Sequence, residues 1–185
     1  MGANTVNKIP TIFVRDMSRQ PAVVTPVWVE GCEWVRDGEG TATCKYDGTS
    51  CLVRDGKLYK RRELRPGDVA PADFESLGTD ENTGKTVGWV PVSDSPEDRW
   101  HREALTGGEE PGTYELMGPK IQGNKSRLAG HVLISHLTAE RFPEAPRDFD
   151  GLQAWLTEHN IEGLVWHHRD GRMAKIKRRD FGLKW

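Results

Sequence analysis

The chain has 185 residues, 36% of them hydrophobic and 29% charged, which is enough for one ordinary domain with a lean core. The N-terminus does not show a basic segment followed by an apolar one, so we do not expect a signal peptide. No apolar run is long enough to cross a bilayer, so we do not expect a membrane partner. The cysteines are odd in number and have no C-x-x-C spacing, namely Cys32, Cys44 and Cys51. This argues against a disulfide framework or a zinc knuckle, and we therefore expect a reduced, cytoplasmic protein.

The net charge of −2 hides an uneven distribution. Residues 54–65 carry six Lys or Arg against two acids, and residues 167–185 carry seven against two. Residues 66–115 carry twelve acids against three bases. The two basic segments would form an anion site if folding brings them together, whereas the plainer alternative is two solvated strand faces.

In the first half of the chain, β-branched and aromatic runs predict strands. The Asp55-Gly56 pair is a strong signal for a hairpin between two of them. Residues 66–86, rich in Pro, Gly, Asp and Asn, indicate an exposed excursion. The strands expected here are 21–35, broken at Pro26 and Gly31, followed by 41–45, 50–54 and 57–63.

In the second half, short strands alternate with turn-rich stretches, and residues 93–111 are acidic and turn-rich. Leu152, Trp155 and Leu156 fall at helical spacing within 148–160, with Asp148 or Asp150 as the cap. Overall the pattern predicts a mostly antiparallel β protein with few helices. Strands are expected at 87–92, at 112–121 (where a turn follows), at 131–136, and at 162–168 and 173–179 around an Asp170-Gly171 turn.

Four short motifs contain residues suited to chemistry. Lys45 precedes "YDGT", Glu115 ends "TYE", and Glu162 opens "EGLVW". Lys175 and Lys177 alternate along "AKIKR", so both point to one face of a strand. Each motif alone is weak, because a solvated lysine or a carboxylate paired with a surface arginine explains it equally well.

In order, the motifs "KYDG", "YELMG", "EGLVW" and "KIK" resemble those of the covalent nucleotidyltransferases, which include DNA ligases, RNA ligases and mRNA capping enzymes. The segments "GWVPV", "GPKIQGN", "IEGLVWHHRDGRMAKIKRR" and "FGLKW" narrow the resemblance to the RNA ligase 1 family of 5′-to-3′ RNA ligases. The similarity covers roughly residues 27–185 and is most specific at 161–185. Residues 66–111 are shorter than the corresponding region of the vertebrate members.

This resemblance implies an α+β fold, namely the antiparallel-sheet nucleotidyltransferase (adenylation) domain of ATP-dependent ligases, which is ATP-grasp-like. Residues 1–185 would form a single minimal domain without a C-terminal OB domain, and residues 1–20 could be an N-terminal extension. The implied function is an ATP-dependent RNA ligase that joins RNA 5′-phosphate and 3′-hydroxyl ends through lysyl-AMP and RNA-adenylate intermediates. ATP and Mg²⁺ (or Mn²⁺) would be required, and an end-healing or RNA-binding partner protein could assist.

The resemblance also implies residue roles. Lys45 would attack the α-phosphate of ATP, and Glu162 would hold the metal ion directly or through water. An amine nucleophile must be neutral, whereas lysine at its reference pKa near 10.4 is almost fully protonated at neutral pH. Partial burial and neighbouring cations favour the neutral form. The expected ATP-binding residues are Asp47, Gly48, Arg61, Arg62, Glu115, Glu162, Lys175 and Lys177, and Arg62 is favoured over Arg61 because strand neighbours face opposite sides.

Other readings stay open at this point. A DNA ligase or GTP-using capping enzyme would share the motifs, although such relatives carry a further OB-type domain, and a non-catalytic RNA-binding relative would keep the fold. Trp89, Trp100 and Trp166 could stack on adenine or an RNA base, but core packing is the alternative for each and is favoured for Trp166. The pairs His131/His136 and His167/His168 diverge in strands, so a histidine metal site is not expected. We expect Cys44 to be packed inside.

Overall fold

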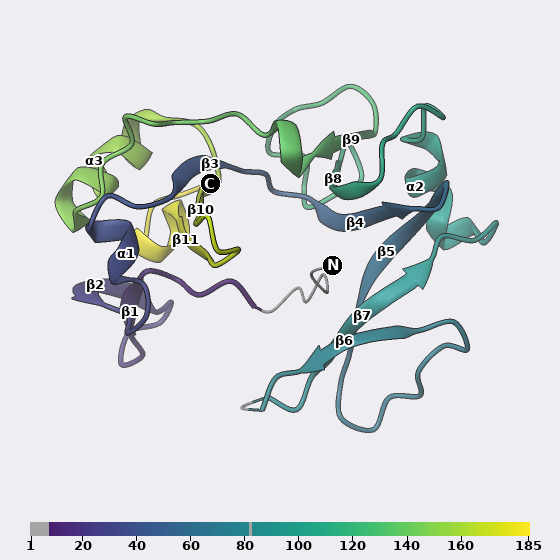
Figure 1. Cartoon of the computed structure of the whole chain (residues 1–185), viewed down its shortest axis with the longest axis horizontal. Helices are drawn as coiled ribbons and strands as arrows, with labels where there is room; N and C mark the ends of the chain where they lie inside the picture. The colour runs from purple at the N-terminus through teal and green to yellow at the C-terminus, as the bar shows by residue number, and fades with distance from the viewer. Residues whose placement is uncertain (1–7, 82) are drawn as a thin grey trace. The chain divides into compact units, whose positions relative to one another are not determined.

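The computed structural model describes residues 8–81 and 83–185, which form two compact units (Figure 1). The central unit is Asp47–Thr138. The terminal unit combines Lys8–Tyr46 with Ala139–Trp185. Each is described by itself below. The chain passes from one to the other between Tyr46 and Asp47, inside the "KYDG" motif.

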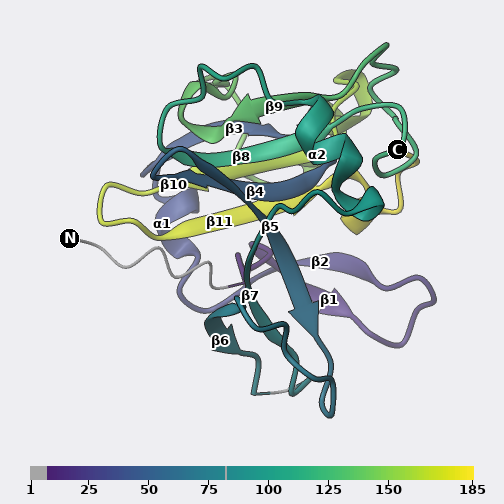
Figure 2. The ribbon, with the colours of Figure 1, turned by 90° about the vertical axis from the view of Figure 1, so that its right-hand side faces the viewer.

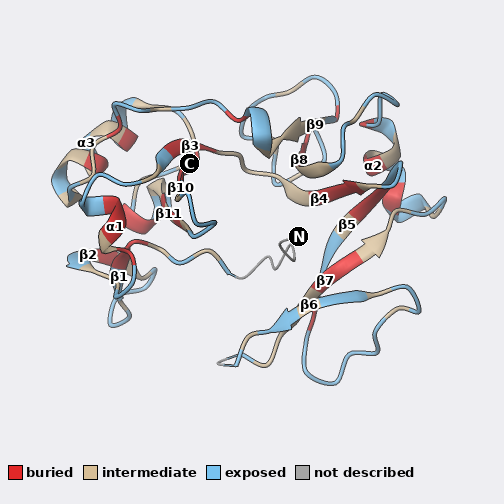
Figure 3. Ribbon diagram, in the orientation of Figure 1, coloured by how far each residue is buried: buried red, intermediate tan, exposed pale blue. Residues whose placement is uncertain are grey.

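The terminal unit is built on a three-stranded antiparallel sheet with the order β11-β10-β3. Side chains alternate across these strands, so one face is apolar and packs into a core with one side of α1 and of α3, and Figure 3 shows buried residues among exposed ones on both helices. Asp148 caps α3 by accepting a hydrogen bond from the Gly151 amide, as one of the two predicted caps. The elements are α1 Glu33–Arg36, β3 Thr41–Lys45, α3 Phe149–Glu158, β10 Gly163–His167, β11 Met173–Lys177 and the 3-10 turn η3 Arg178–Phe181.

A two-stranded sheet, β1 Phe13–Asp16 with β2 Val23–Trp28, completes this unit. The predicted break at Pro26 is wrong, because β2 runs through it. The register between the strands shifts near this point, and such an irregularity accommodates a residue that has no backbone N–H to donate. The sequence also predicted that a strand resumes after Gly31. This prediction is wrong, because the following residues form α1, which buries Trp34 and Val35.

The central unit is a six-stranded antiparallel sheet with the order β6-β7-β5-β4-β8-β9, whose strands can be followed in Figure 2. Asp55 and Gly56 both adopt positive φ at the predicted hairpin, which matches the twist of the strands they join. One face of the sheet packs with Ala104, which follows α2. The strands are β4 Thr49–Arg54, β5 Lys57–Leu64, β6 Glu75–Thr79, β7 Thr86–Pro91, β8 Gly112–Met117 and β9 Val132–Ser135, and the short helices are η1 Pro96–Asp98, α2 Arg99–Glu103 and η2 His136–Thr138.

Strands are confirmed within the predicted ranges 41–45, 50–54, 57–63, 87–92, 112–121, 131–136, 162–168 and 173–179, and the architecture fits the α+β class. The end of the last range is wrong, because β11 ends at Lys177 and the next residues form η3. Besides α1, the strands β1 and β6 and the helix α2 were not expected. The strand β6 lies inside the predicted excursion, and α2 lies inside the predicted turn-rich stretch. Among the described residues, no helix is long and apolar enough to cross a bilayer.

Candidate functional site

In the terminal unit, three lysines share the sheet face opposite the apolar core. The antiparallel register aligns Lys45 on β3 with Gly163 on β10 and with Lys177 on β11. Lys175 lies two residues earlier on β11, and alternation therefore gives it the same face. Three ammonium groups thus lie on one small area of sheet, although they come from segments 130 residues apart in the sequence.

Glu162 is the counter-charge of this cluster. Its Oε2 accepts a hydrogen bond from Lys45 Nζ at 2.7 Å, and its Oε1 lies 3.2 Å from Lys177 Nζ. Glu162 is only 7% exposed, so the carboxylate is stabilised by these two cations and not by water. The expectation that Lys45 lies beside the later lysines is confirmed, but the expected environment was incomplete, because its nearest charged neighbour is the carboxylate of Glu162.

Lys175 carries the clearest electrostatic perturbation of the cluster. Burial, followed by the positive charges of Lys177 and Lys45, lowers the pKa of Lys175 to about 8. Burial also lowers the pKa of Lys177, against the opposing effect of Glu162. Lys175 is therefore the member whose charge changes most readily near neutral pH.

Gly163 explains how the cluster packs so closely. A Cβ at this position would lie 2.1 Å from the carbonyl oxygen of Ile176 and 2.8 Å from the Cα of Lys177. Both are backbone atoms of β11, so a side chain would separate β10 from β11. The glycine of the "EG" motif thus leaves the space between Lys45 and Lys177 open for the carboxylate of Glu162.

Two residues that sequence reasoning missed hold the end of β11 in place. Asp180 is 3% exposed, and its Oδ1 accepts a 2.7 Å hydrogen bond from Arg15. Its Oδ2 accepts a hydrogen bond from the backbone amide of Lys177. Nothing local in "RDMS" marks Arg15 as the partner of an acid 165 residues away, so only the fold reveals this pair.

In the central unit, Glu115 on β8 is held by a backbone amide and a histidine ring. Its Oε1 accepts a 3.1 Å hydrogen bond from the Gly48 amide, and its Oε2 lies 3.1 Å from Nε2 of His136. The other ring nitrogen of His136 contacts Thr113 Oγ1 at 3.1 Å. A Cβ on Gly48 would lie 2.3 Å from the carbonyl oxygen of Leu116, so this glycine packs directly against the backbone of β8. His136 had been considered only as a metal ligand, and its role as a partner of Glu115 was missed.

The register also separates the two arginines. In the strand register, Glu115 on β8 lies opposite Ser50 on β4, and Leu52 on β4 lies opposite Tyr59 on β5. From Tyr59 onward, the side chains of β5 alternate between the two faces of the sheet. Arg61 therefore shares the sheet face of Glu115, whereas Arg62 shares the opposite face with Lys60. Both arginines are exposed. The register thus places Arg61, and not Arg62, on the face of Glu115, while the preference for Arg62 as the nucleotide contact stays a prediction.

The expected site residues therefore fall into two groups. The structure brings Lys45, Glu162, Lys175 and Lys177 together in the terminal unit. Asp47, Gly48, Arg61, Arg62 and Glu115 belong to the central unit, where Gly48 and Glu115 are in contact.

The aromatic candidates pack internally. Trp166 and Trp89 are at most 1% exposed, as favoured for Trp166. Trp100 stacks on His131 and lies under the guanidinium of Arg99. Cys44 is buried as expected, and this burial raises the pKa of its thiol to about 12. Over the described ranges, no group of three or more His, Cys, Asp and Glu forms a metal-binding cluster.

Comparisons with known proteins agree with these motifs. The family model for RNA ligase 1 matches residues 108–185, which contain Glu115, Glu162, Lys175 and Lys177. The predicted resemblance to the RNA ligase 1 family is confirmed. RNA ligase 1 of Danio rerio is 31% identical over 138 residues, which cover 55% of this chain and 42% of that protein. RNA ligase 1 of Rattus norvegicus is 25% identical over 264 residues, covering 96% of this chain and 81% of that protein.

The lengths of these matches add one detail. The alignment with the rat protein spans 264 positions, which exceeds the 185 residues of this chain, so the rat protein carries extra residues inside the aligned stretch. The match to the zebrafish protein spans less than half of that relative.

Proposed function

We propose that this chain is an ATP-dependent RNA ligase that joins RNA 5′-phosphate and 3′-hydroxyl ends through a lysyl-AMP and an RNA-adenylate intermediate. The observation that carries the proposal is the cluster of Lys45, Glu162, Lys175 and Lys177 on one sheet face, in a chain similar to RNA ligase 1. Three ammonium groups around one buried carboxylate suit a polyanionic substrate next to an amine nucleophile.

In the proposed first step, Lys45 Nζ attacks the α-phosphorus of ATP. The P–N bond forms as the bond from that phosphorus to the bridging oxygen breaks, and pyrophosphate leaves. Before attack the amine must lose its proton and its contact with Glu162. Lys175 and Lys177 lie on the same sheet face as Lys45, so their positive charges would face the phosphates of the bound ATP.

The later steps transfer the AMP. An oxygen of the RNA 5′-phosphate attacks the adenylate phosphorus, and the P–N bond breaks to release Lys45. The RNA 3′-hydroxyl then attacks the 5′-phosphate, and AMP leaves. Lys175 and Lys177 would neutralise the phosphates in these steps, and an anion beside Lys175 would favour its charged form.

The central-unit residues would hold the nucleoside part. Glu115 would accept hydrogen bonds from the ribose hydroxyls, since the Gly48 amide and His136 fix its carboxylate. Arg61 is now preferred over Arg62 as the basic contact to the sugar or incoming end, because it shares the face of Glu115. Asp47 would help to orient the nucleotide or metal.

Glu162 would have to give up at least one of its lysine contacts to hold a divalent cation. Mg²⁺ commonly takes one or two carboxylate oxygens and completes its shell with phosphate oxygens and water, so a lone buried carboxylate suffices. Glu162 would hold Mg²⁺ or Mn²⁺, directly or through water, and the ion would supply neutralisation of phosphate charge.

The test is the intact mass of the protein after incubation with ATP and Mg²⁺. We expect a gain of one AMP that Lys45→Ala abolishes and that the exposed hairpin variant Lys57→Ala retains. A wild-type protein that never gains AMP would exclude the proposal. Label from GTP in place of ATP would indicate a capping-type enzyme, and joining of DNA ends in preference to RNA ends would indicate a DNA ligase.

A further inference from the structure

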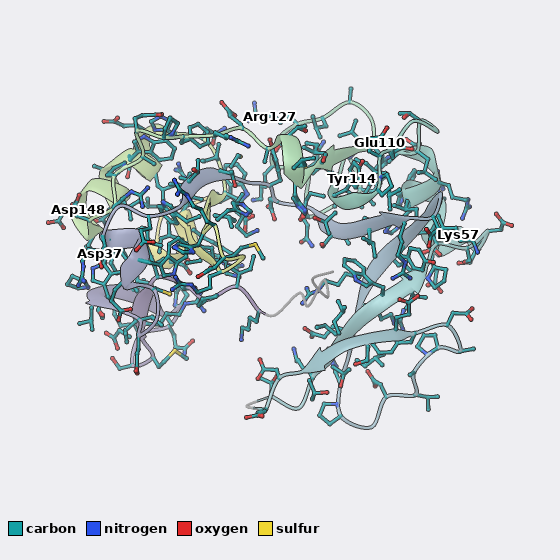
Figure 4. All side chains as sticks on the ribbon, in the orientation of Figure 1. Asp37, Lys57, Glu110, Tyr114, Arg127 and Asp148 are labelled. Atoms are coloured by element: carbon teal, nitrogen blue, oxygen red, sulfur yellow. The ribbon has the colours of Figure 1, made fainter. Side chains whose placement is uncertain are left out.

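The stretch from Leu116 to Ala139 contains no acidic residue, although the chain as a whole has 28 acids in 185 residues. At that average, a segment of this length would carry about three or four acids. Its cations Lys120, Lys125 and Arg127 are all exposed, and Figure 4 shows Arg127 on the surface of the central unit. A strongly acidic region precedes this stretch, so the absence of acids here is a local property.

The loop between β8 and β9 has a defined backbone conformation that is energetically unfavourable for several of its residues. Gln122, Asn124 and Arg127 all adopt positive φ, a region that non-glycine residues rarely occupy. The side chain of Asn124 fixes the loop by donating to the carbonyl of Leu128 and accepting from its amide. Strained backbone of this kind persists where the surrounding structure enforces it, often at functional sites. The cations are therefore presented on a shaped loop.

The position of the loop within the central unit is also informative. It leaves β8 three residues after Glu115, at the end of the sheet where Gly48 leads into β4. The Asp55-Gly56 hairpin, with the exposed cation Lys57, lies at the opposite end of β4. A six-residue strand separates the two ends by roughly 20 Å. The basic loop therefore borders the Glu115 group, and Lys57 does not.

We propose that the 118–131 loop binds the sugar–phosphate backbone of the RNA substrate next to its reacting end, an inference that rests on the proposed function. Lys and Arg contacts to phosphates position a nucleic acid without reading its sequence. A loop with three exposed cations and no acidic residue of its own suits this task, although Glu103 contacts it at His131. The triphosphate of ATP offers similar chemistry, so the experiment must separate the two sources of phosphate.

The test compares RNA binding with lysyl-AMP formation in the same variants. Lys125→Gln and Arg127→Asn remove one cation each, and asparagine tolerates the positive φ at position 127. We expect the double variant to bind a fluorescent 5′-phosphorylated single-stranded RNA about tenfold more weakly. The slope of log affinity against log salt should fall by about 0.7 for each cation removed. Lysyl-AMP formation and its ATP requirement should be unchanged.

Lys57→Gln is the matched control, because it removes an exposed cation at the opposite end of β4. It should leave the RNA affinity and the salt slope unchanged. Wild-type RNA affinity in the double variant, with circular dichroism showing an intact fold, would overturn the inference. A parallel loss of lysyl-AMP formation would also overturn it, by assigning the cations to ATP. If wild-type protein forms no lysyl-AMP, the proposed function fails, while the RNA-binding comparison still decides the role of the loop.

Discussion

Glu162 in the terminal unit and Glu115 in the central unit are both largely shielded carboxylates, but they are stabilised in different ways. Glu162 lies between the ammonium groups of Lys45 and Lys177. Glu115 accepts a hydrogen bond from the amide of Gly48 and contacts the ring of His136. The first arrangement is a cluster of ion pairs that another cation or anion can change, whereas the second combines a backbone amide with a histidine ring.

The two groups share one feature, which is a glycine packed against the backbone of a neighbouring strand. Gly163 follows Glu162 in the sequence and abuts β11. Gly48 donates to Glu115 and abuts β8. In both places the missing side chain allows a carboxylate to reach its partners. The comparison therefore predicts that charge substitutions affect mainly the terminal unit, while steric substitutions at these glycines affect both units alike.

The largest effect is expected for Glu162→Ala. This change leaves Lys45 and Lys177 beside Lys175 without a counter-charge, and removing one partner of a buried pair costs about 3 kcal/mol of unfolding free energy. Urea denaturation of the wild type and variant measures this loss. The control is Glu63→Ala, which removes the partner of Lys85 from an exposed ion pair and should cost less than about 1 kcal/mol. Equal costs for the two variants would contradict the contrast between the groups.

A somewhat smaller loss is expected for alanine at either glycine. At Gly163 and Gly48 the added Cβ would meet a carbonyl oxygen at 2.1 Å and 2.3 Å, so the strands must shift, at a cost of about 2 kcal/mol. Lysyl-AMP formation should fall with both, because each shift displaces a site carboxylate. Gly130→Ala meets nothing within 4 Å and serves as the control. A variant at Gly163 as stable and active as Gly130→Ala would show that this close approach is not required.

Local patterns in the sequence predicted most of the strands. The Asp55-Gly56 hairpin and the helix after Asp148 depend on short-range turn and capping chemistry, and both are confirmed. The helix α1 was missed because Trp34 and Val35 have strand propensity, and packing in the terminal core overrides it. The strand β6 was missed because its sequence, "ESLGT", carries little apolar alternation and is defined by pairing with β7.

The site residues that belong to sequence motifs could be predicted. Contacts between residues that are far apart in the sequence could not. The motif residues Lys45, Glu162, Lys175 and Lys177 do meet on one face, as predicted. The direct contact of Lys45 with Glu162 was not foreseen, because it depends on strand register and not on spacing. The same reason hid the role of His136. The acid-free stretch before Glu140 was visible in the sequence but was overlooked beside the more strongly basic segments.

For Lys175→Met, in contrast to the changes above, the free energy of unfolding is expected to increase. The pKa of Lys175 is about 8, below its ordinary value of 10.5, so at pH 7 the folded protein carries a charge that burial disfavours. Methionine should therefore stabilise the fold at pH 7 by about 1 to 2 kcal/mol, while lysyl-AMP formation falls sharply. Denaturation and intact mass measure the two effects.

The pH dependence of this stabilisation sharpens the test. Between about pH 8 and 10.5 the unfolded chain binds more protons at Lys175 than the folded chain does, so Lys175 makes wild-type stability rise with pH in this window. The Lys175→Met variant lacks this contribution, and its advantage should shrink toward pH 10. Lys57→Met, at an exposed position, should show neither effect. A constant difference between wild type and Lys175→Met at all pH values would contradict the electrostatic account of the cluster.

The smallest effect is expected for His136→Leu, which tests the contacts of Glu115 in the central unit. The change removes the contact to Glu115 Oε2 while leaving the Gly48 amide on Oε1, so the carboxylate loses one of two anchors. One hydrogen bond is worth about 1 kcal/mol, so the KM for ATP in lysyl-AMP formation should rise about fivefold. Thr113→Val removes only the contact behind the imidazole and should give a smaller rise. If Thr113→Val matched or exceeded His136→Leu, the effect would reflect the packing of β8, and His136 would not be the residue that orients Glu115.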